Sequence, residues 1–175
     1  MITHEILSQA EDDRKIYLTI MSKKHRDTIL HIVQEAGIEH RHDIHEAVRT
    51  SQEASELRGV SMSSGAKAIV LRGKKTKDSF LVVIPADRKV DISVIKDLVG
   101  EKLSFNPRVE EEFDCEPGSV PPFGSVIGLQ TYADNDLEET LNFNIGLRTD
   151  SLQISKADYL ALEKPITGNF SIKHE

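Results

Sequence analysis

Residues 115–124 constrain the fold more than any other part of this chain, because these ten residues include three prolines and two glycines. Proline cannot continue a helix or a central strand, and Gly118 and Gly124 are free to adopt positive φ. Val120 and Phe123 supply apolar anchors, so the sequence predicts a rigid, irregular loop rather than a linker. Such a loop can direct backbone N–H groups at one point, as oxyanion binding requires, whereas a structural turn is the more common use of a Pro/Gly cluster.

Length and composition indicate a single domain. The 175 residues are enough for a proper core, and 38% apolar with 29% charged residues is typical of a soluble globular protein. One cysteine excludes an intrachain disulfide, and no apolar run approaches the roughly 18–20 residues of a membrane helix. The first residues show no basic segment followed by an apolar one, so no signal peptide is predicted and the cytoplasm is the expected location.

The chain is acidic, with 22 Lys and Arg against 29 Asp and Glu and a net charge of −7. Phosphate contacts rest on positive charge, so DNA is not an expected partner and any RNA contact requires a local basic patch. Two clusters qualify, Arg72-Gly73-Lys74-Lys75-Thr76-Lys77 and Lys23-Lys24-His25-Arg26. The alternative for both is an ordinary solvated turn or helix start.

The first third of the chain predicts helices with recognisable ends. Residues 1–21 fit either a short strand or a helix. Ser22 is expected to cap a helix that Gly37 stops. Thr50 followed by Glu53 has the pattern of a capping box at the start of a further helix.

The rest of the chain alternates between strands and helices. A basic turn separates residues 66–72 from residues 80–85, which predicts a hairpin whose second strand is buried on both faces. Further strands are expected at residues 102–105, 126–129, 141–145 and 152–154, helices at 91–99, 107–113 and 155–164, and a loose tail at 167–175. This order favours an α+β fold, a single domain with a mixed, largely antiparallel sheet surrounded by helices.

Lys67 is the second residue of chemical interest, because it opens an otherwise apolar strand. Such a lysine either extends its ammonium group to solvent, which is more common, or points it into a cleft. Asp134 lies in Tyr132-Ala133-Asp134-Asn135-Asp136, a composition that is also typical of a turn. Asn144 and Gly146 interrupt another strand, which indicates a bulge or the close approach of a ligand.

Neither a side-chain nucleophile nor a metal site is predicted. Ser119 lacks the G-x-S-x-G elbow, and Cys115 has no assignable partner base. His40, His42 and His45 form a cluster, but it has no matching cysteine pair and no H-E-x-x-H helix. We therefore expect no metal ion and no other cofactor.

Several segments, in order, resemble the YbaK/prolyl-tRNA synthetase-associated domain family, free-standing relatives of the editing insertion domain of bacterial prolyl-tRNA synthetases. The matching segments are 45–54, 65–72, 85–91, 118–122, Asp134 and 143–146. The resemblance implies an editing domain over residues 22–166, an N-terminal extension over 1–21 and a tail over 167–175. Several relatives carry a histidine or a small hydroxyl residue after the late glycine, whereas this chain has Leu147-Arg148-Thr149-Asp150, so the amino acid that is removed is not implied.

The resemblance further implies an aminoacyl-tRNA deacylase that hydrolyses the ester of mischarged tRNA, in particular tRNA(Pro), in trans. Catalysis would rest on Lys67 and on backbone oxyanion stabilisation by Gly118, Ser119 and Val120. The residues implied in substrate binding are Thr50, Pro121, Pro122, Phe123, Gly124, Asp134, Asn144 and Gly146. Those implied in tRNA contact are Arg72, Lys74, Lys75 and Lys77.

The implied partners are mischarged aminoacyl-tRNA, held by its acceptor end, and prolyl-tRNA synthetase, with no membrane and no DNA. The alternative is a non-catalytic module on the same fold, which would bind a nucleotide, tRNA or a protein.

Overall fold

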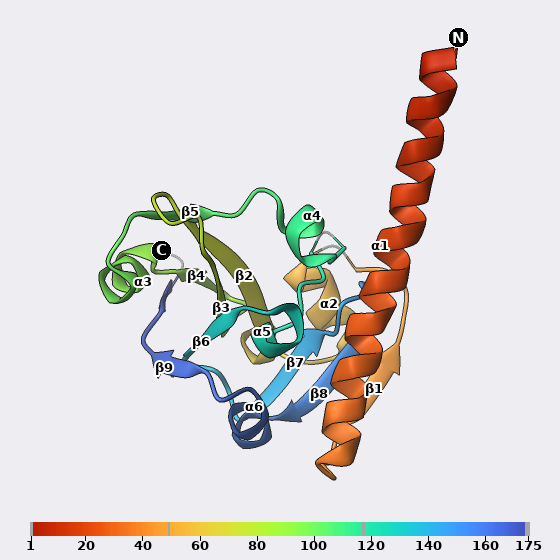
Figure 1. Ribbon diagram of the computed structural model, residues 1–175. Helices are drawn as coiled ribbons and strands as arrows, with labels where there is room; N and C mark the ends of the chain where they lie inside the picture. Colours follow the sequence, from red (N-terminus) through yellow and green to blue (C-terminus); the bar gives the residue numbers. More distant parts are fainter. Residues whose placement is uncertain (1, 49, 117, 174–175) are drawn as a thin grey trace.

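The computed structural model describes residues 2–48, 50–116 and 118–173, and its centre is a five-stranded sheet (Figure 1). The strand order is β5-β2-β3-β6-β9, namely Leu103–Phe105, Ala66–Gly73, Ser79–Pro85, Gln130–Asp134 and Ile166–Gly168. Strand β2 pairs antiparallel with β3 and β5, whereas β6 pairs parallel with β3 and β9. The predicted hairpin is therefore confirmed, and Lys67 lies near the start of β2, opposite Ile84.

A second sheet is antiparallel and has the order β1-β8-β7, namely Arg41–Ile44, Asp150–Ser155 and Thr140–Asn144. A parallel bridge between Gly65 and Asn142 connects the segment before β2 to β7. Strands β4 (Arg88–Val90) and β10 (Ser171–Lys173) form a small third sheet. The expected α+β fold with mixed pairing is thus confirmed, although its strands are divided among three sheets.

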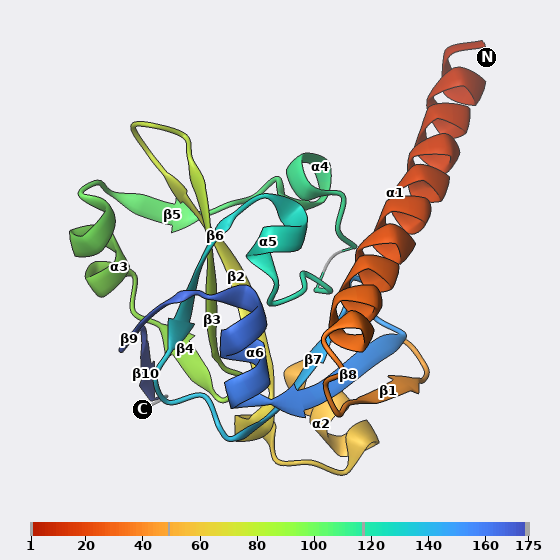
Figure 2. The same cartoon turned by 60° about the horizontal axis from the view of Figure 1, so that its bottom comes forward.

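Helix α1 (Ile2–Glu35) is much longer than the others, and its N-terminal half extends away from the rest of the molecule (Figures 1 and 2). Its C-terminal half packs Ile29 and Val33 into the core. The shorter helices are α2 (Ser51–Arg58), the 3₁₀ helix η1 (Met62–Ser64), α3 (Ile92–Val99), α4 (Val109–Phe113), α5 (Gly124–Ile127) and α6 (Lys156–Glu163). Across the described ranges, no helix is long and apolar enough to cross a membrane.

The expected helix start at Ser22 is wrong. Ser22 lies in the middle of α1, where its side chain is buried and donates a hydrogen bond of 3.5 Å to the carbonyl oxygen of Asp114. Residues 2–35 contain neither proline nor glycine, so nothing in the backbone interrupts one continuous helix. Of the two alternatives for residues 1–21, the helix is confirmed from Ile2 onward.

The strand expected at residues 126–129 is also wrong. Residues 124–127 form the short helix α5, Gly128 ends it, and the strand β6 begins at Gln130. The first N–H groups of α5 donate to Thr131 Oγ1 and to Glu163, and these acceptors stabilise a helical turn. A Cβ atom on Gly124 would lie 2.2 Å from Thr131 Oγ1, so this glycine is required by close packing.

The loose tail expected at residues 167–175 needs the same correction. Strand β9 pairs with β6, and β10 pairs with β4, so residues 166–168 and 171–173 are part of the sheets. Between them, Phe170 is only 1% exposed. Residues 174–175 lie outside the described ranges.

Strand β3 separates two cores. Leu81 and Val83 face the larger core, whereas Val82 and Ile84 face the smaller one, and all four are 0% exposed. The prediction that this strand is buried on both faces is confirmed. The larger core also contains three aromatic rings that contact one another, those of Phe123, Phe143 and Tyr159.

Candidate functional site

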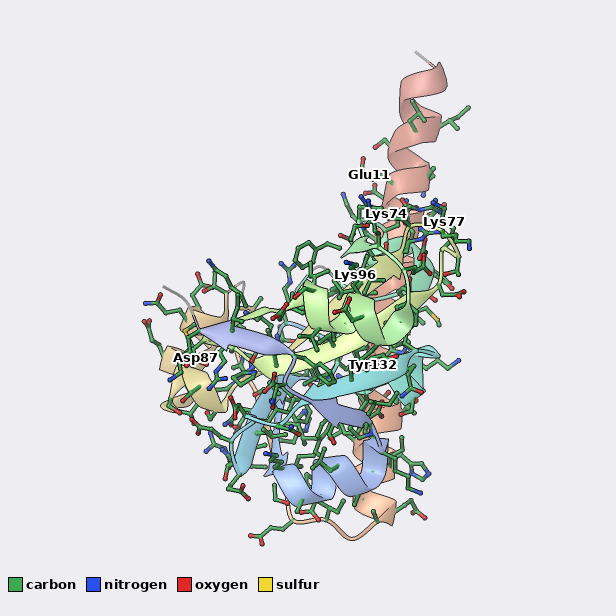
Figure 3. All side chains as sticks on the ribbon, turned by 90° about the vertical axis from the view of Figure 1, so that its left-hand side faces the viewer. Glu11, Lys74, Lys77, Asp87, Lys96 and Tyr132 are labelled. Atoms are coloured by element: carbon green, nitrogen blue, oxygen red, sulfur yellow. The ribbon has the colours of Figure 1, made fainter. Side chains whose placement is uncertain are left out.

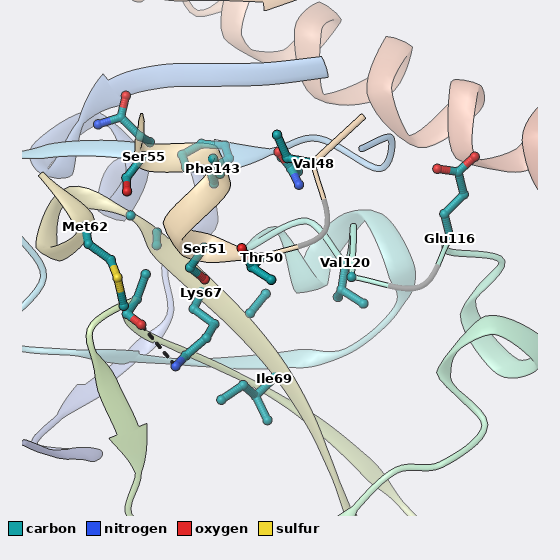
Figure 4. A pocket seen from close by; sticks show the side chains of 18 of the residues that line it. Val48, Thr50, Ser51, Ser55, Met62, Lys67, Ile69, Glu116, Val120 and Phe143 are labelled. Atoms are coloured by element: carbon teal, nitrogen blue, oxygen red, sulfur yellow. Dashed lines mark hydrogen bonds between the residues drawn. The ribbon is translucent and has the colours of Figure 1, made fainter. Parts of the chain in front are cut away.

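A cavity of about 530 Å³ lies between α2, β2 and β7 and is also lined by Phe105, Asn106, Pro107, Val109, Glu110, Glu116, Gly118 and Val120 (Figure 4). Much of its lining is apolar, including Val48, Met62 and Ile69. The polar side chains that line it are those of Thr50, Ser51, Ser55, Arg58, Ser61, Lys67, Asn106, Glu110, Glu116, Asn142 and Asn144. An apolar space with a few polar groups is the usual form of a small-molecule site.

Helix α2 presents one side to this cavity, and its start is fixed by the predicted capping box. Thr50 Oγ1 accepts a hydrogen bond of 3.1 Å from the N–H of Glu53, and the Glu53 carboxylate accepts one of 3.3 Å from the N–H of Thr50. Ser51, Ser55 and Arg58 follow at helical spacing and line the cavity. The capping box therefore fixes where α2 begins, and the side of the helix that carries these three residues faces the cavity.

Lys67 projects from β2 into the same cavity and is half-buried. Its Nζ atom donates a hydrogen bond of 3.2 Å to the carbonyl oxygen of Ala86 (Figure 4) and another of 2.6 Å to that of Arg88. Burial lowers the pKa of Lys67, and the negative charge of Asp87 opposes this shift. An ammonium group has three N–H donors, so one has no partner among the residues that the structure describes.

Arg58 is a second cation in the cavity, and it was not anticipated from the sequence. Its Nη2 atom donates a hydrogen bond of 2.5 Å to Asn144 Oδ1, while its buried Nε has no partner among the described residues. Burial lowers the pKa of Arg58 to about 10, and the charge of Asp43 opposes the shift. Its spacing from Ser51 and Ser55 was the available signal, but a strongly polar side of a short helix also fits ordinary exposure to solvent.

The Pro/Gly loop divides into two parts. Gly118, with a φ of 75°, and Val120 line the cavity, and within the described part of the chain their N–H groups have no hydrogen-bond partner. The N–H of Ser119 instead donates to the carbonyl oxygen of Glu116 at 3.1 Å. Only the first part of the loop therefore offers donors to a ligand.

The second part of the loop is structural in its contacts. Pro121, Pro122, Phe123 and Gly124 are buried and do not line the cavity, and Tyr159 donates a hydrogen bond of 2.7 Å to the carbonyl oxygen of Pro122. Burial and this hydrogen bond hold the loop against the core, and they account for the predicted rigidity.

Ser119 and Cys115, which were not expected to act as nucleophiles, do not line the cavity. Ser119 is fully buried, and its Oγ lies 2.9 Å from the carbonyl oxygens of both Glu116 and Gly146. Cys115 is fully buried as well, and burial raises the pKa of its thiol to about 12. Both side chains are placed to stabilise the loop rather than to attack a substrate.

Asp134 and Gly146, which the resemblance implied in substrate binding, lie outside the cavity. Asp134 is 2% exposed, and its two carboxylate oxygens accept hydrogen bonds from the N–H groups of Asp136 (2.8 Å) and Phe170 (2.7 Å). Gly146 has a φ of 101°, and a Cβ atom there would lie 2.8 Å from the carbonyl oxygen of Ser22. The prediction for this strand was a bulge or the close approach of a ligand, whereas the segment that approaches Gly146 closely is helix α1.

The basic turn of residues 72–77 lies at the other end of β2 from Lys67. Lys74 and Lys77 are far from Asp87, the acidic neighbour of Lys67 (Figure 3). The six residue steps from Lys67 to Gly73, where β2 ends, span about 20 Å in a strand. Arg72 is paired with Glu112 at 2.8 Å, whereas Lys74, Lys75 and Lys77 are exposed.

The histidine cluster makes separate contacts. His42 Nε2 lies 3.1 Å from Asp150 Oδ1, while His40 and His45 contact nearby carbonyl oxygens. Over residues 2–48, 50–116 and 118–173, no group of three His, Cys, Asp or Glu side chains is placed to hold a metal ion.

A search against protein families matches residues 45–162 to the aminoacyl-tRNA editing domain. These residues include α2, β2, β7 and the Pro/Gly loop, and thus the main elements around the cavity.

Two relatives with assigned activities are similar in sequence. The "Multifunctional Ser/Thr-tRNA deacylase ProXp-y" of Escherichia coli K12 is 31% identical over 150 residues, which are 81% of this chain and 90% of the relative. The "Prolyl-tRNA editing protein ProX" of Acetoanaerobium sticklandii is 31% identical over 83 residues, 46% of this chain and 51% of the relative.

Solved structures share the fold. Hypothetical protein APE2540 superimposes with a TM-score of 0.75 at 22% identity, over 82% of this chain and 99% of that one. A protein described as a candidate trans-editing enzyme for prolyl tRNA synthetase gives a TM-score of 0.72 at 21% identity, over 85% and 97% of the two chains.

Proposed function

Because this chain belongs to the aminoacyl-tRNA editing domain family, we propose that its cavity hydrolyses the ester of mischarged aminoacyl-tRNA in trans. The resemblance seen in the sequence is confirmed by these matches, and the chain is an aminoacyl-tRNA deacylase by family. The observation that carries the site assignment is that Lys67, Gly118 and Val120 line one cavity with unused hydrogen-bond donors.

The reaction is the attack of water on the ester carbonyl that joins an amino acid to the ribose of the terminal adenosine. Negative charge develops on the carbonyl oxygen, and the bond between carbonyl carbon and ribose oxygen then breaks. The ribose oxygen takes up a proton, and the free amino acid leaves. We assign oxyanion stabilisation to the N–H groups of Gly118 and Val120, because fixed backbone donors need no reorganisation during the reaction.

For Ser119 we propose a positioning role. Its N–H is already used by the carbonyl oxygen of Glu116, so Ser119 positions the two neighbouring donors rather than touching the substrate. Lys67 has one free donor, which we assign to the substrate oxygens next to the ester. We infer that a ribose hydroxyl of the substrate orients the attacking water.

We propose serine and threonine as the amino acids removed. The relative that is similar over most of this chain is named a Ser/Thr-tRNA deacylase, and hydroxyl-bearing residues are frequent in the cavity lining. These residues are Thr50, Ser51, Ser55 and Ser61. A hydroxylated side chain would find hydrogen-bond partners there, which a purely apolar pocket would not provide.

Transfer RNA for proline remains the proposed carrier, supported by the sequence resemblance and by the prolyl-tRNA editing relative. Prolyl-tRNA synthetase as a partner stays a prediction that co-purification would test. Since aminoacyl-tRNA is made in the cytoplasm, the proposal keeps the cytoplasm as the expected location.

The test is deacylation of seryl-, threonyl-, alanyl- and cysteinyl-tRNA by the wild-type protein, with binding of uncharged tRNA measured in parallel. We expect turnover of seryl- and threonyl-tRNA. Saturable binding of tRNA without turnover of any member of the panel would instead favour the non-catalytic binding module.

A further inference from the structure

Arg58 is a cation in the cavity with spare binding capacity. A guanidinium group has five N–H donors, and in the described part of the chain Arg58 makes a single hydrogen bond, to Asn144, and no ion pair with a carboxylate. Its buried Nε is left without a partner. Buried polar groups are nearly always hydrogen-bonded in native proteins, so this donor indicates a ligand that completes the site.

The backbone places Arg58 and Lys67 around the same space. Gly65 and Asn142 form a parallel bridge, and Lys67 and Asn144 each follow two residues later on the two diverging chain segments. Both side chains line the cavity, and Asn144 holds the guanidinium of Arg58. The carboxylates in the lining, Glu110 and Glu116, come instead from residues 105–120.

This distribution of charge gives the cavity a cationic and an acidic side. The acceptor end of a charged tRNA has the same polarity, with one phosphate next to the terminal ribose and an ammonium group on the amino acid. The ester, ribose and adenine are neutral. The only stable anion near the reacting group is therefore the phosphate, and a planar guanidinium fits phosphate oxygens with two parallel hydrogen bonds.

We propose that Arg58, positioned by Asn144, binds the phosphate of the tRNA's terminal adenosine and so sets the direction in which the aminoacyl end enters the cavity. The proposal rests on the proposed function, because it takes its ligand from that reaction. Arg58 is the last residue of α2, where the helix dipole favours a positive charge. A guanidinium with a pKa of about 10 is still charged at neutral pH, so it can attract a phosphate there.

The test uses two ligands that differ only in the phosphate: an amide analogue of 3′-seryl-adenosine that cannot be hydrolysed, with and without a 5′-phosphate. Dissociation constants are measured by calorimetry for the wild type, Arg58→Gln, Arg58→Lys and Asn144→Ala. Arg14→Gln is the control, because Arg14 is an exposed arginine on α1 outside the cavity.

We expect the wild type and Arg14→Gln to bind the phosphorylated analogue about 10-fold or more tightly than the other, as a charge-assisted hydrogen bond implies. Arg58→Gln should bind both analogues alike, with unchanged affinity for the one without phosphate. Arg58→Lys should keep part of the preference, and Asn144→Ala should lose part of it.

Two outcomes overturn the proposal. Arg58→Gln could keep the wild-type preference for phosphate, or it could weaken both analogues equally, as a merely structural residue would. If Arg58→Gln does not fold, Arg58→Lys decides, because an undiminished preference in that variant excludes the bidentate contact. If the wild type turns over charged tRNA and either outcome is found, the phosphate contact of Arg58 is wrong and the proposed function stands. If the preference for phosphate depends on Arg58 but no charged tRNA is turned over, the deacylase proposal is wrong and the phosphate contact stands.

Discussion

Lys67 and Asp134 are both charged residues at the end of a strand in the central sheet, yet they differ in burial and in their hydrogen bonds. Asp134 is 2% exposed, and both of its oxygens accept backbone hydrogen bonds. Lys67 is half-buried beside a cavity and keeps one donor free. The comparison shows two uses of a charge at the end of a strand: Asp134 is held by backbone donors away from the cavity, whereas Lys67 lines it.

The largest expected effect is the loss of deacylation rate in the Lys67→Ala variant. Loss of an electrostatic group at the reacting centre typically costs about 10²- to 10³-fold in rate. Single-turnover deacylation of seryl-tRNA should fall by that amount, with little change in the free energy of unfolding. Lys89→Ala, an exposed lysine on β4, is the matched control and should keep the wild-type rate. A wild-type rate in Lys67→Ala would contradict the catalytic role proposed for Lys67, and with it the difference from Asp134.

The opposite pattern is expected for Asp134→Ala. The substitution leaves the N–H groups of Phe170 and Asp136 without their acceptors, and Phe170 is 1% exposed. Urea unfolding should show a loss of about 2–4 kcal/mol, while the rate per folded molecule stays near that of the wild type. Asp134→Asn retains one acceptor oxygen and should lose less. A large loss of deacylation rate in a folded Asp134 variant would indicate that Asp134 takes part in substrate binding or catalysis.

Gly118 and Gly128 allow a matched test of the loop, because both have a φ of 75°. An alanine at either position adopts a left-handed conformation that costs about 1–2 kcal/mol. Gly118→Ala should also slow deacylation about 10-fold, since it displaces a proposed oxyanion donor. Gly128→Ala should show the same loss of stability at an unchanged rate, and equal rates in the two variants would contradict the loop's assignment.

The smallest expected effect is that of the basic turn. Lys74, Lys75 and Lys77 follow the end of β2 that is opposite to Lys67, so replacing all three by glutamine should leave the single-turnover rate at saturating tRNA unchanged. Each lost phosphate contact should reduce the slope of log K against log salt by about 0.7–0.9. The double variant Lys23→Gln, Lys24→Gln tests the second basic cluster in the same way. An unchanged slope in the triple variant would show that the basic turn does not contact tRNA phosphates.

Local sequence signals predicted the local structure well. The capping box at Thr50, the hairpin around the basic turn and the helix expected from residue 155 all depend on residues close in the chain, and each is confirmed. The continuation of α1 through Ser22 and the helix at residues 124–127 were missed. Ser22 is a plausible cap that tertiary packing buries inside a longer helix, and α5 depends on Glu163, which lies far along the chain.

The candidate site was predictable only in part, for the same reason. Lys67, Thr50, Gly118, Val120 and Asn144 do line one cavity. Which part of the Pro/Gly loop faces it depends on contacts such as that of Tyr159 with Pro122, and no local pattern contains them. Arg58 is recognisable only once β7 brings Asn144 to it.

The most direct test of the account is to locate the bound substrate. Backbone amide shifts can be followed by NMR while the wild-type protein is titrated with the amide analogue of 3′-seryl-adenosine 5′-phosphate. The account predicts the largest changes at Gly118, Val120 and Asn144, and none around Asp134. Changes centred on residues 134–136, or no changes at saturating analogue, would contradict the claim that this cavity is the deacylation site.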